Sequence, residues 1–451
     1  MGSEWVEVAL GDLFKVKHGF AFKGEFFTEE PTKTVLVTPG NFAVGGGFQS
    51  TKVKYYSGPV PDGYILQPGQ IVVTMTDLSK QSDTLGLAAV VPRDKKIWLH
   101  NQRVGLLEFK KDNAACPQFI AYILRSHEYR AWIIGSATGT TVKHTSPNRI
   151  QAYSCKIPSY KKQKSIAKTL SILDDKIDLN RQMNTTLETM AQALFKSWFV
   201  DFDPVIDNAL AAGNTIPEPF HARAEARKAL GDQRKPLPAA IQHQFPDRFV
   251  LAEEMGWVPE GWEVASFGSK IELAYGKSLA VSVRVPGLIP VYGSGGATGF
   301  HNAALVKAPG IIVGRKGTVG SLYWVENDFF PIDTVFYVVN NSGLPLYWIY
   351  QALQLFDIKS MGEDSAVPGV NRNVIYSKKM VFPKLQAIEE YSKQVSAMTS
   401  RKRALDTANE ALTTLRDTLL PKLLSGELRV LEAEATVASA PAAKATADFA
   451  G

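Results

Sequence analysis

The stretch IPSYKKQKSIAKTLSILDDKIDLNRQMNTTLETMAQALFKSWF (residues 157–199) returns in altered form as VFPKLQAIEEYSKQVSAMTSRKRALDTANEALTTLRDTLLPKLL (residues 381–424). The two copies align without a gap, with Pro158 matching Pro383 at an offset of 225 residues. The segments that lead to them also begin alike, with Trp5-Val6-Glu7-Val8 and Trp262-Glu263-Val264. A repeat this long is not a solenoid of short units. The sequence therefore predicts a duplicated module, each copy a globular part followed by a long helix.

Both long segments carry a heptad pattern typical of a coiled coil. The positions that define it are Leu173, Ile177, Asn180, Leu187, Leu194 and Trp198 in the first segment, and Tyr391, Leu405, Asn409, Leu412 and Leu419 in the second. Antiparallel pairing with aligned centres sets Trp198 against Tyr391 and Ile177 against Leu412. The alternative is two amphipathic helices that pack separately on the globular parts.

The centre of that pairing sets Asn180 against Asn409. A buried Asn pair satisfies its hydrogen bonds in one register only, so we expect it to fix the register at a cost in stability. Lys402 and Arg416 would face leucines and extend their charged ends to water. About 33 paired residues at about 1.5 Å each predict a rod of roughly 50 Å, which would hold two similar sites at a fixed separation.

The fold class predicted is α+β, with two strand-rich domains joined by two long helices that pair as an antiparallel coiled coil, in a pseudo-two-fold repeat. Short β-like runs such as Thr34–Val37 and Gly310–Gly314 alternate with turn signals in both modules. The predicted division is a first globular domain at 1–157, a helix at 158–199, a proline-rich linker at 200–260, a second globular domain at 261–382, a helix at 383–430 and a disordered tail at 431–451.

Composition indicates an ordinary globular protein of 451 residues with a net charge of +6. Residues 1–157 carry 18 Lys and Arg against 13 Asp and Glu, whereas residues 252–382 carry 10 against 11. The basic first module permits a nucleic-acid partner. Cys116 and Cys155 form no disulfide framework, and neither a secretory signal nor a membrane span is visible. We expect a cytoplasmic protein that does not bind a membrane.

No catalytic motif survives inspection. Tyr275-Gly276-Lys277-Ser278 resembles the end of a P-loop, but Ile271 stands where its first glycine is required. The carboxylates and lysines of Pro61-Asp62 and Asp94-Lys95-Lys96 fit a loose nuclease pattern, although Pro-Asp-Gly is turn chemistry. His and Cys residues show no metal-ligand spacing. We therefore expect a recognition subunit with no catalytic residue, no metal and no cofactor of its own.

At this point the sequence resembles the specificity (S) subunits of bacterial type I restriction–modification systems, over about residues 1–430. The segment Met190–Pro204 is similar to the central conserved region of that family, and Leu423–Leu428 is similar to the distal one. Tyr292–Gly296 and Gly314–Gly317 resemble part of its target recognition domains, and Pro259-Glu260-Gly261-Trp262 resembles the usual start of the second domain.

The resemblance implies two target recognition domains that each read one half of a split site in double-stranded DNA, with the helices as spacer. It also implies two modification subunits that bind S-adenosylmethionine and methylate adenine, and restriction subunits that cleave unmodified DNA in defence against foreign DNA. Two alternatives stay open: a DNA-reading coiled-coil scaffold for a different effector, and a coiled-coil interaction protein that does not bind DNA.

Residues that could touch DNA are cations, amides and hydroxyls near glycines or strand ends. The candidates are Lys52, Lys54, Tyr55, Thr76, Asn101, Gln102, Arg103, Thr140 and Lys143 in the first module, and Lys277, Tyr292, Ser294, Arg315 and Lys316 in the second. Arg315 and Lys316 stand out because Gly314 and Gly317 would let the backbone approach a duplex. His18, Phe20 and Phe22 are expected in the core.

Overall fold

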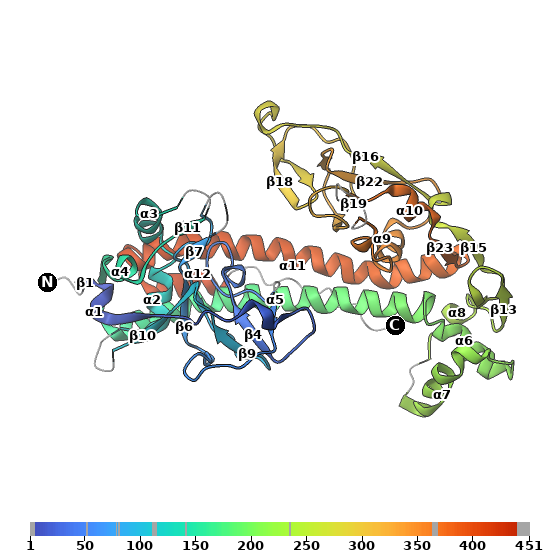
Figure 1. The fold of residues 1–451 in the computed structure, drawn as a ribbon, viewed down its shortest axis with the longest axis horizontal. Coiled ribbons are helices and arrows are strands. Elements are labelled where there is room, and N and C mark those ends of the chain that lie inside the picture. The colour runs from blue at the N-terminus through green and yellow to red at the C-terminus, as the bar shows by residue number, and fades with distance from the viewer. Residues whose placement is uncertain are drawn as a thin grey trace. The chain divides into compact units, whose positions relative to one another are not determined.

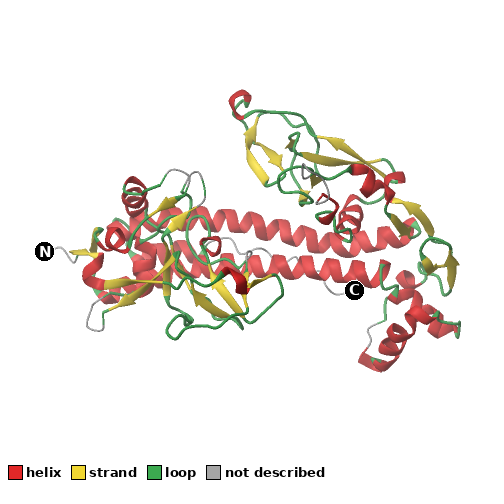
Figure 2. Ribbon diagram, viewed as in Figure 1, coloured by secondary structure: helices red, strands yellow, loops and turns green. Residues whose placement is uncertain are grey.

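The computed structural model describes residues 5–50, 53–77, 79, 82–110, 115–139, 142–233, 236–362 and 369–439. Two compact units share the chain: unit 1 comprises residues 1–182 and 404–451, and unit 2 comprises residues 183–403. Each unit contains one strand-rich part and sections of both long helices (Figures 1 and 2). The boundaries of the units thus cut through the long helices and do not coincide with helix ends.

Unit 1 is built on a four-stranded antiparallel sheet in the order β2-β10-β6-β8. A second sheet has the order β3-β5-β4-β9, in which β4 and β9 run parallel. The strand bounds are β1 (Val6–Ala9), β2 (Phe14–His18), β3 (Phe27–Thr28), β4 (Thr34–Val37), β5 (Lys54–Tyr56), β6 (Ile71–Thr74), β7 (Thr76–Asp77), β8 (Ala88–Val90), β9 (Ile97–His100), β10 (Val104–Phe109), β11 (Lys143–His144) and β12 (Ser154–Ile157).

Short helices complete unit 1. They are α1 (Leu10–Leu13), α2 (Pro117–Ile123), α3 (His127–Gly135) and α4 (Pro147–Gln151), followed near the C-terminus by α12 (Val430–Ala438). Phe119, Ile120 and Ile123 of α2 are buried against the first sheet in one apolar cluster. The pair β1–β12 closes the module immediately before the long helix begins.

Unit 2 repeats the strand order of the main sheet with different residues, and its second sheet has three strands where that of unit 1 has four. Its main sheet has the order β16-β22-β19-β20, and its second sheet has the order β18-β17-β21 with β17 and β21 parallel. The bounds are β13 (Phe249–Ala252), β14 (Gly256–Pro259), β15 (Glu263–Ser266), β16 (Ile271–Tyr275), β17 (Ile289–Gly293), β18 (Gly296–His301), β19 (Gly310–Gly314), β20 (Leu322–Val325), β21 (Phe330–Pro331), β22 (Val335–Asn340), β23 (Lys379–Phe382), α9 (Leu346–Gln354) and α10 (Arg372–Ser377). The internal repeat is therefore a repeat of strand order as well as of sequence.

The two long helices, α5 (Tyr160–Phe199) and α11 (Leu385–Ser425), lie side by side and antiparallel (Figure 1). In unit 1, Leu173 and Ile177 are buried in one cluster with Leu412 and Leu419. In unit 2, Lys402 of α11 pairs with Glu188 of α5 at 2.5 Å. The α+β class with an antiparallel coiled coil is the predicted one. Of the other heptad positions, Leu405 is buried, while Leu187 and Leu194 are half-buried.

Asn180 and Asn409 meet in unit 1, where Asn180 Nδ2 donates to Asn409 Oδ1 at 2.9 Å. Both side chains are half-buried, so some of their polar atoms still reach water. This hydrogen bond satisfies one donor and one acceptor. A register slip of one helical turn would place both groups opposite apolar neighbours. The role of the pair in fixing the register stays a prediction.

We expect a disulfide between positions 180 and 409 when Asn180→Cys and Asn409→Cys are combined, in a background where Cys116 and Cys155 are replaced by Ala. The expectation follows because facing side chains at one layer fall within disulfide reach. Oxidation followed by mass spectrometry under non-reducing conditions is the measurement. A combination displaced by one turn, Asn180→Cys with Thr413→Cys, is the control and should stay reduced; the reverse pattern would refute the register.

Arg416 was predicted to extend its charge to water, and that prediction is wrong. The Arg416 side chain is only 7% exposed, and its Nη1 pairs with Asp174 Oδ1 at 3.0 Å. Arg125, two residues after the end of α2, pairs with the same carboxylate, and its Nη1 lies 2.6 Å from Asp174 Oδ2. A buried arginine is retained at this helix position because a carboxylate neutralises it.

Residues 200–260, which the sequence analysis assigned to a linker, are folded within unit 2. It forms α6 (Asp203–Ala212), α7 (His221–Ala229), α8 (Ala239–Gln242) and the β13–β14 hairpin. Pro204 lies in the first turn of α6, where a missing N–H costs nothing. Asp203 accepts hydrogen bonds from Arg223 Nε at 2.7 Å and from Ser197 Oγ at 2.6 Å, and these bonds tie α6 to α7 and to α5.

The predicted disordered tail begins too early. Residues 430–438 form α12, and Ala433 and Val437 are buried in the apolar cluster of unit 1. Alanine-rich sequence favours helix when one face can be buried, and this helix has a core to pack on. Residues 440–451 lie outside the described residues.

Candidate nucleic-acid interface

The turn between β9 and β10 presents three of the predicted residues of unit 1. Asn101 Oδ1 accepts a hydrogen bond from the backbone N–H of Arg103 at 3.2 Å, which shapes the turn. The side chains of Gln102 and Arg103 are exposed. Gly19 lies so close to this turn that a Cβ there would collide with the Asn101 carbonyl group. The end of β2 and the Asn101–Arg103 turn are therefore fixed against each other.

His100, at the start of the same turn, is a core residue. It is fully buried, its Nε2 lies 2.9 Å from the carbonyl oxygen of Val104, and burial lowers its pKa to about 4. A histidine with that pKa is neutral at physiological pH and offers no charge to a phosphate group.

The β7–β11 ladder contains two further predicted residues, and they differ in exposure. Thr76 is buried, and its Oγ1 lies 3.2 Å from His144 Nδ1. Lys143 is half-buried and pairs across the ladder with Asp77. Burial alone would raise the pKa of Asp77, but hydrogen bonds from Ser79 and Thr84 outweigh it and lower that pKa. Thr76 is thus a support of the ladder, and an ionised carboxylate stands beside Lys143.

The remaining predicted residues of unit 1 lie elsewhere. Lys54 and Tyr55 belong to β5, which is two strands from β9 in the second sheet. Lys54 is exposed, with its ammonium group 4.0 Å from the centroid of the Phe27 ring. Lys52 and Thr140 lie outside the described residues.

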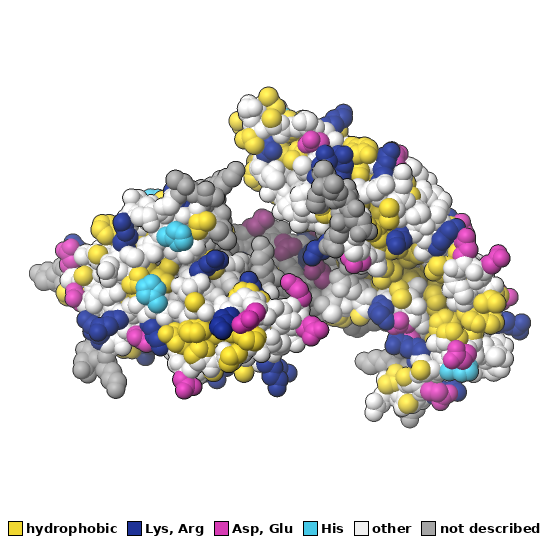
Figure 3. All heavy atoms as spheres, viewed as in Figure 1, with side chains coloured by type: hydrophobic (Ala, Val, Ile, Leu, Met, Phe, Trp, Pro, Cys, Tyr) yellow, Lys and Arg dark blue, Asp and Glu magenta, His cyan; other side chains and the backbone are white. Residues whose placement is uncertain are grey.

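A shallow hollow of about 520 Å³ beside the end of β2 was not predicted. It is lined by Lys15, Val16, His18, Ser146, Pro147, Asn148 and Gln151. His18 is exposed, which corrects its expected place in the core, whereas Phe22 is buried as expected. Alternation of exposed and buried positions along β2 is the signal that would have found Lys15, whereas His18 breaks that alternation at the end of the strand. Figure 3 shows basic side chains dispersed among acidic and apolar ones on the visible face.

In unit 2, Arg315 and Lys316 directly follow β19. The guanidinium carbon of Arg315 lies 4.8 Å from the centroid of the Tyr275 ring, and its Nη1 donates to the Asp333 carbonyl oxygen at 3.2 Å. Lys316 is exposed, and Gly317 after it has φ = +80°. Glycine adopts this left-handed backbone without strain, and the turn carries the half-buried Arg315 and the exposed Lys316.

Tyr275 is a member of this site that sequence reasoning missed. Its ring is 48% exposed at the end of β16, and the guanidinium carbon of Arg372 lies 5.0 Å from the ring centroid. Lys277, two residues further along, is also exposed. Two guanidinium groups near one aromatic ring form a positively charged platform, because each is attracted to the ring. Such a platform suits a phosphate group or a base edge.

Ser294 and Tyr292 act as supports of the neighbouring loop. Ser294 is buried; its Oγ accepts from the Thr318 backbone N–H at 3.3 Å, and its carbonyl oxygen accepts from Tyr323 at 2.9 Å. Tyr292 packs against Phe329 with ring centroids 6.0 Å apart, and burial raises its pKa. The Ser294 side chain holds the loop that follows Lys316, whereas the half-buried Tyr292 packs its ring on Phe329.

Within the residues that the structure describes, no three His, Cys, Asp or Glu side chains gather as a metal site. None of the helices in that part of the chain is long and apolar enough to cross a membrane.

The duplicated topology places an exposed polar turn beside the first strand of the main sheet in each unit. Residues 2–189 match the model of the type I restriction modification DNA specificity domain. The chain is 27% identical over 369 residues to the specificity subunit of the type I restriction enzyme HindI of Haemophilus influenzae, covering 70% of this chain and 78% of that one. The MjaIX specificity subunit of Methanocaldococcus jannaschii is 23% identical over 321 residues, 70% of each chain.

Among solved structures, an S subunit from M. genitalium aligns with 93% of this chain and 96% of its own length, at 19% identity and a TM-score of 0.49. On the sequence matches, the chain is similar to the specificity subunits of type I restriction enzymes, and its residues 2–189 resemble the DNA specificity domain of these proteins.

Proposed function

We propose that this chain reads a bipartite site in double-stranded DNA, one half with each unit. The observation that supports the proposal is the repeat of strand order. In both units the first strand of the main sheet ends beside an exposed polar turn, at His18 and at Tyr275. Two copies of one reading surface require two half-sites, and the paired helices would set the gap between them.

The same proposal includes partners and chemistry outside this chain. Two modification subunits would dock on the long helices, bind S-adenosylmethionine and methylate adenine in each half-site, and restriction subunits would cleave unmodified DNA. The similarity of the sequence to specificity subunits of type I restriction enzymes supports participation in such a complex. The chain itself would bind DNA, and the described residues form no metal cluster that would suggest further chemistry.

Methylation mapping tests the proposal directly. The chain is expressed with its neighbouring modification subunit in a methylation-free bacterial host, and modified adenines are located across the genome. We expect one motif with two short defined halves around a fixed gap. A verified soluble complex that adds no methylation, although the chain binds DNA, would favour a scaffold for a different effector.

Lys316→Ala is expected to weaken DNA binding about equally for all sequences and to lower the slope of log K against log salt by about 1. The reason is that an exposed ammonium group beside a glycine turn acts as a point charge on a phosphate group. Binding of the methyltransferase complex to a labelled duplex at several salt concentrations is the measurement. Lys307→Ala, whose Nζ is paired with Asp328 at 2.6 Å, is the matched control and should leave the slope unchanged. An unaltered slope for Lys316→Ala would remove that residue from the interface.

A further inference from the structure

The two units share a set of backbone hydrogen bonds that identifies equivalent residues without reference to side chains. In unit 1, the Met75 N–H donates to the Arg103 carbonyl oxygen at 3.0 Å, and the Thr145 N–H donates to the Met75 carbonyl oxygen at 3.0 Å. In unit 2, the Arg315 N–H donates to the Thr334 carbonyl oxygen at 2.9 Å. The Val370 N–H donates to the Arg315 carbonyl oxygen at 3.0 Å.

The strands around these bonds agree. Val104 pairs with Thr74 in unit 1, and Val335 pairs with Gly314 in unit 2, in each case one residue away from the bonds described. Thr145 and Val370 each stand directly before the N-cap residue of a short helix, α4 or α10. Met75 is therefore the structural counterpart of Arg315, and Arg103 is the counterpart of Thr334. We call these positions, with Thr145 and Val370, the strand-end junction.

Each strand-end junction carries one arginine, but on opposite sides of the same backbone hydrogen bond. In unit 1 the arginine is the acceptor residue, Arg103, and the donor residue, Met75, is buried. In unit 2 the arginine is the donor residue, Arg315. The acceptor residue is Thr334, whose hydroxyl accepts a hydrogen bond from the Ser294 N–H at 3.3 Å. In both units the junction adjoins the end of the first sheet strand, at His18 or Tyr275.

The two arginines are held differently. Arg315 is held near the faces of Tyr275 and Phe336, at 4.8 and 5.8 Å from their centroids, and by the Asp333 carbonyl oxygen. Arg103 is exposed at the tip of its turn, and only its backbone is fixed. The two arginines adjoin different strands of the sheet and are held by different contacts. Their guanidinium groups are therefore placed differently, although the surrounding scaffold is the same.

We propose that Arg103 and Arg315 have the same function in the two units, although they are not structural counterparts: each reads the DNA sequence by recognising a guanine in one half-site. The inference rests on the proposed function. An arginine fork pairs with the O6 and N7 atoms of guanine in the major groove, which no other base offers as two acceptors. The arginine stands on the acceptor residue of the junction in unit 1 and on the donor residue in unit 2. This difference lets one protein scaffold read two unlike half-sites. Tyr275 is then a positioning residue that acts through Arg315.

The test compares methylation motifs of the complete modification complex carrying Arg103→Ala or Arg315→Ala. Each variant is expected to lower the preference for guanine at one position of one half-site by roughly 5- to 150-fold, the equivalent of one bidentate contact. The other half-site should stay unchanged, and the two variants should affect opposite halves. Arg103→Lys and Arg315→Lys keep the charge but lose the fork, so they should relax the same positions and also serve if an alanine variant fails to fold.

Exposed arginines away from the strand-end junctions provide the controls. Arg93→Ala in unit 1 and Arg248→Ala in unit 2 should leave both half-sites intact. A wild-type motif with two halves that all four junction variants leave unchanged, in complexes of normal assembly, would overturn this inference and leave the proposed function standing. A wild-type complex that yields no bipartite motif would instead overturn the proposed function, and this inference with it.

Discussion

Asp174→Asn is expected to lower the local stability of unit 1 by about 3–5 kcal/mol, because it removes the carboxylate that two buried guanidinium groups share and leaves Asp417, at 2.7 Å, as a partner of Arg416 alone. Arg125 donates to Asp174 Oδ2 from Nη1 at 2.6 Å, and Arg416 donates to Oδ1 at 3.0 Å. The Tyr122 hydroxyl adds a third donor at 2.8 Å. The side chains of Arg125 and Arg416 are 6% and 7% exposed, so water cannot replace the lost charge.

Hydrogen exchange of the full-length chain, followed by mass spectrometry, measures this loss where it occurs. Peptides of α2 and of the first half of α5 should exchange roughly 10²- to 10⁴-fold faster in the variant. Asp178→Asn is the matched control on the same helix, because Asp178 and its partner Arg181 are 53% and 55% exposed. An exposed pair contributes about 1 kcal/mol or less. Equal effects of the two substitutions would show that burial does not make the Asp174 network important.

The same network predicts how stability depends on pH. Burial acts to raise the pKa of Asp174, but Arg125 and Arg416, with the Tyr122 hydroxyl, outweigh burial and hold that pKa below its usual value. A carboxylate with a lowered pKa in the folded state contributes its full stability above about pH 5, and the contribution is lost as pH falls below about 4. Protection of α2 should therefore decline over that range in the wild type and more weakly in Asp174→Asn.

The coiled coil was predictable because its evidence is periodic and local to two segments. A heptad repeat fixes which side chains of one helix face the other, so the meeting of Asn180 with Asn409 follows from counting once the antiparallel direction is chosen. Arg416 lay beyond this reasoning. Its neutralising partner, Asp174, is not one of the heptad positions considered. The second arginine, Arg125, is 49 residues from Asp174 in the sequence.

The folded character of residues 200–260 was missed for a different reason. A proline in the first turn of a helix and a proline that ends a helix look alike when only spacing is read. Pro204 begins α6, and the ion pairs of Asp203 with Arg223 that lock the segment join residues 20 apart. Such pairing becomes visible only when the helices are placed.

The candidate site was predictable in part. Arg315 and Lys316 were found because flanking glycines are a local signal, whereas Tyr275 became apparent only when Arg315 and Arg372 were seen at its ring. Which residues contact DNA, and where the domain boundaries lie, stay predictions.

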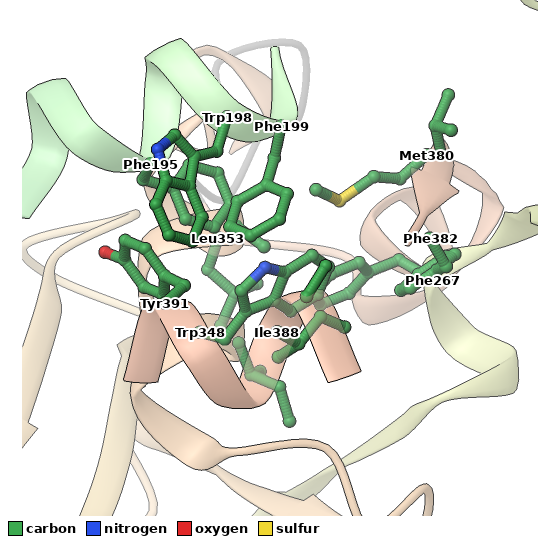
Figure 4. Packing of buried hydrophobic residues seen from close by; sticks show 14 of the residues in the cluster. Phe195, Trp198, Phe199, Phe267, Trp348, Leu353, Met380, Phe382, Ile388 and Tyr391 are labelled. Carbon is green, nitrogen blue, oxygen red and sulfur yellow. The ribbon is translucent and has the colours of Figure 1, made fainter. Parts of the chain in front are cut away.

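Trp198→Ala is expected to destabilise unit 2 by about 3–5 kcal/mol, since it empties a large space in an aromatic cluster. Figure 4 shows Phe195, Trp198 and Phe199 of α5 gathered with Trp348 of α9 and with Tyr391 of α11. Trp198 is 2% exposed, and its ring centroid lies 5.1 Å from that of Phe245 and 6.2 Å from that of Tyr391. The indole thus joins α5 to α11 and to the segment that follows α8.

The matched control is Trp257→Ala in the same unit, because Trp257 is 38% exposed on β14 and its removal should cost about 1.5 kcal/mol or less. Hydrogen exchange should quicken in the second half of α5, in α9 and in the first half of α11 for Trp198→Ala, with unit 1 peptides unchanged. In the modification complex, that variant should weaken reading of the half-site assigned to Arg315 more than the other. If exchange in unit 2 stayed at the wild-type rate, the aromatic cluster would not be what holds the strand-rich part of unit 2 on its helices, and the Lys402–Glu188 ion pair and the remaining aliphatic contacts would have to suffice.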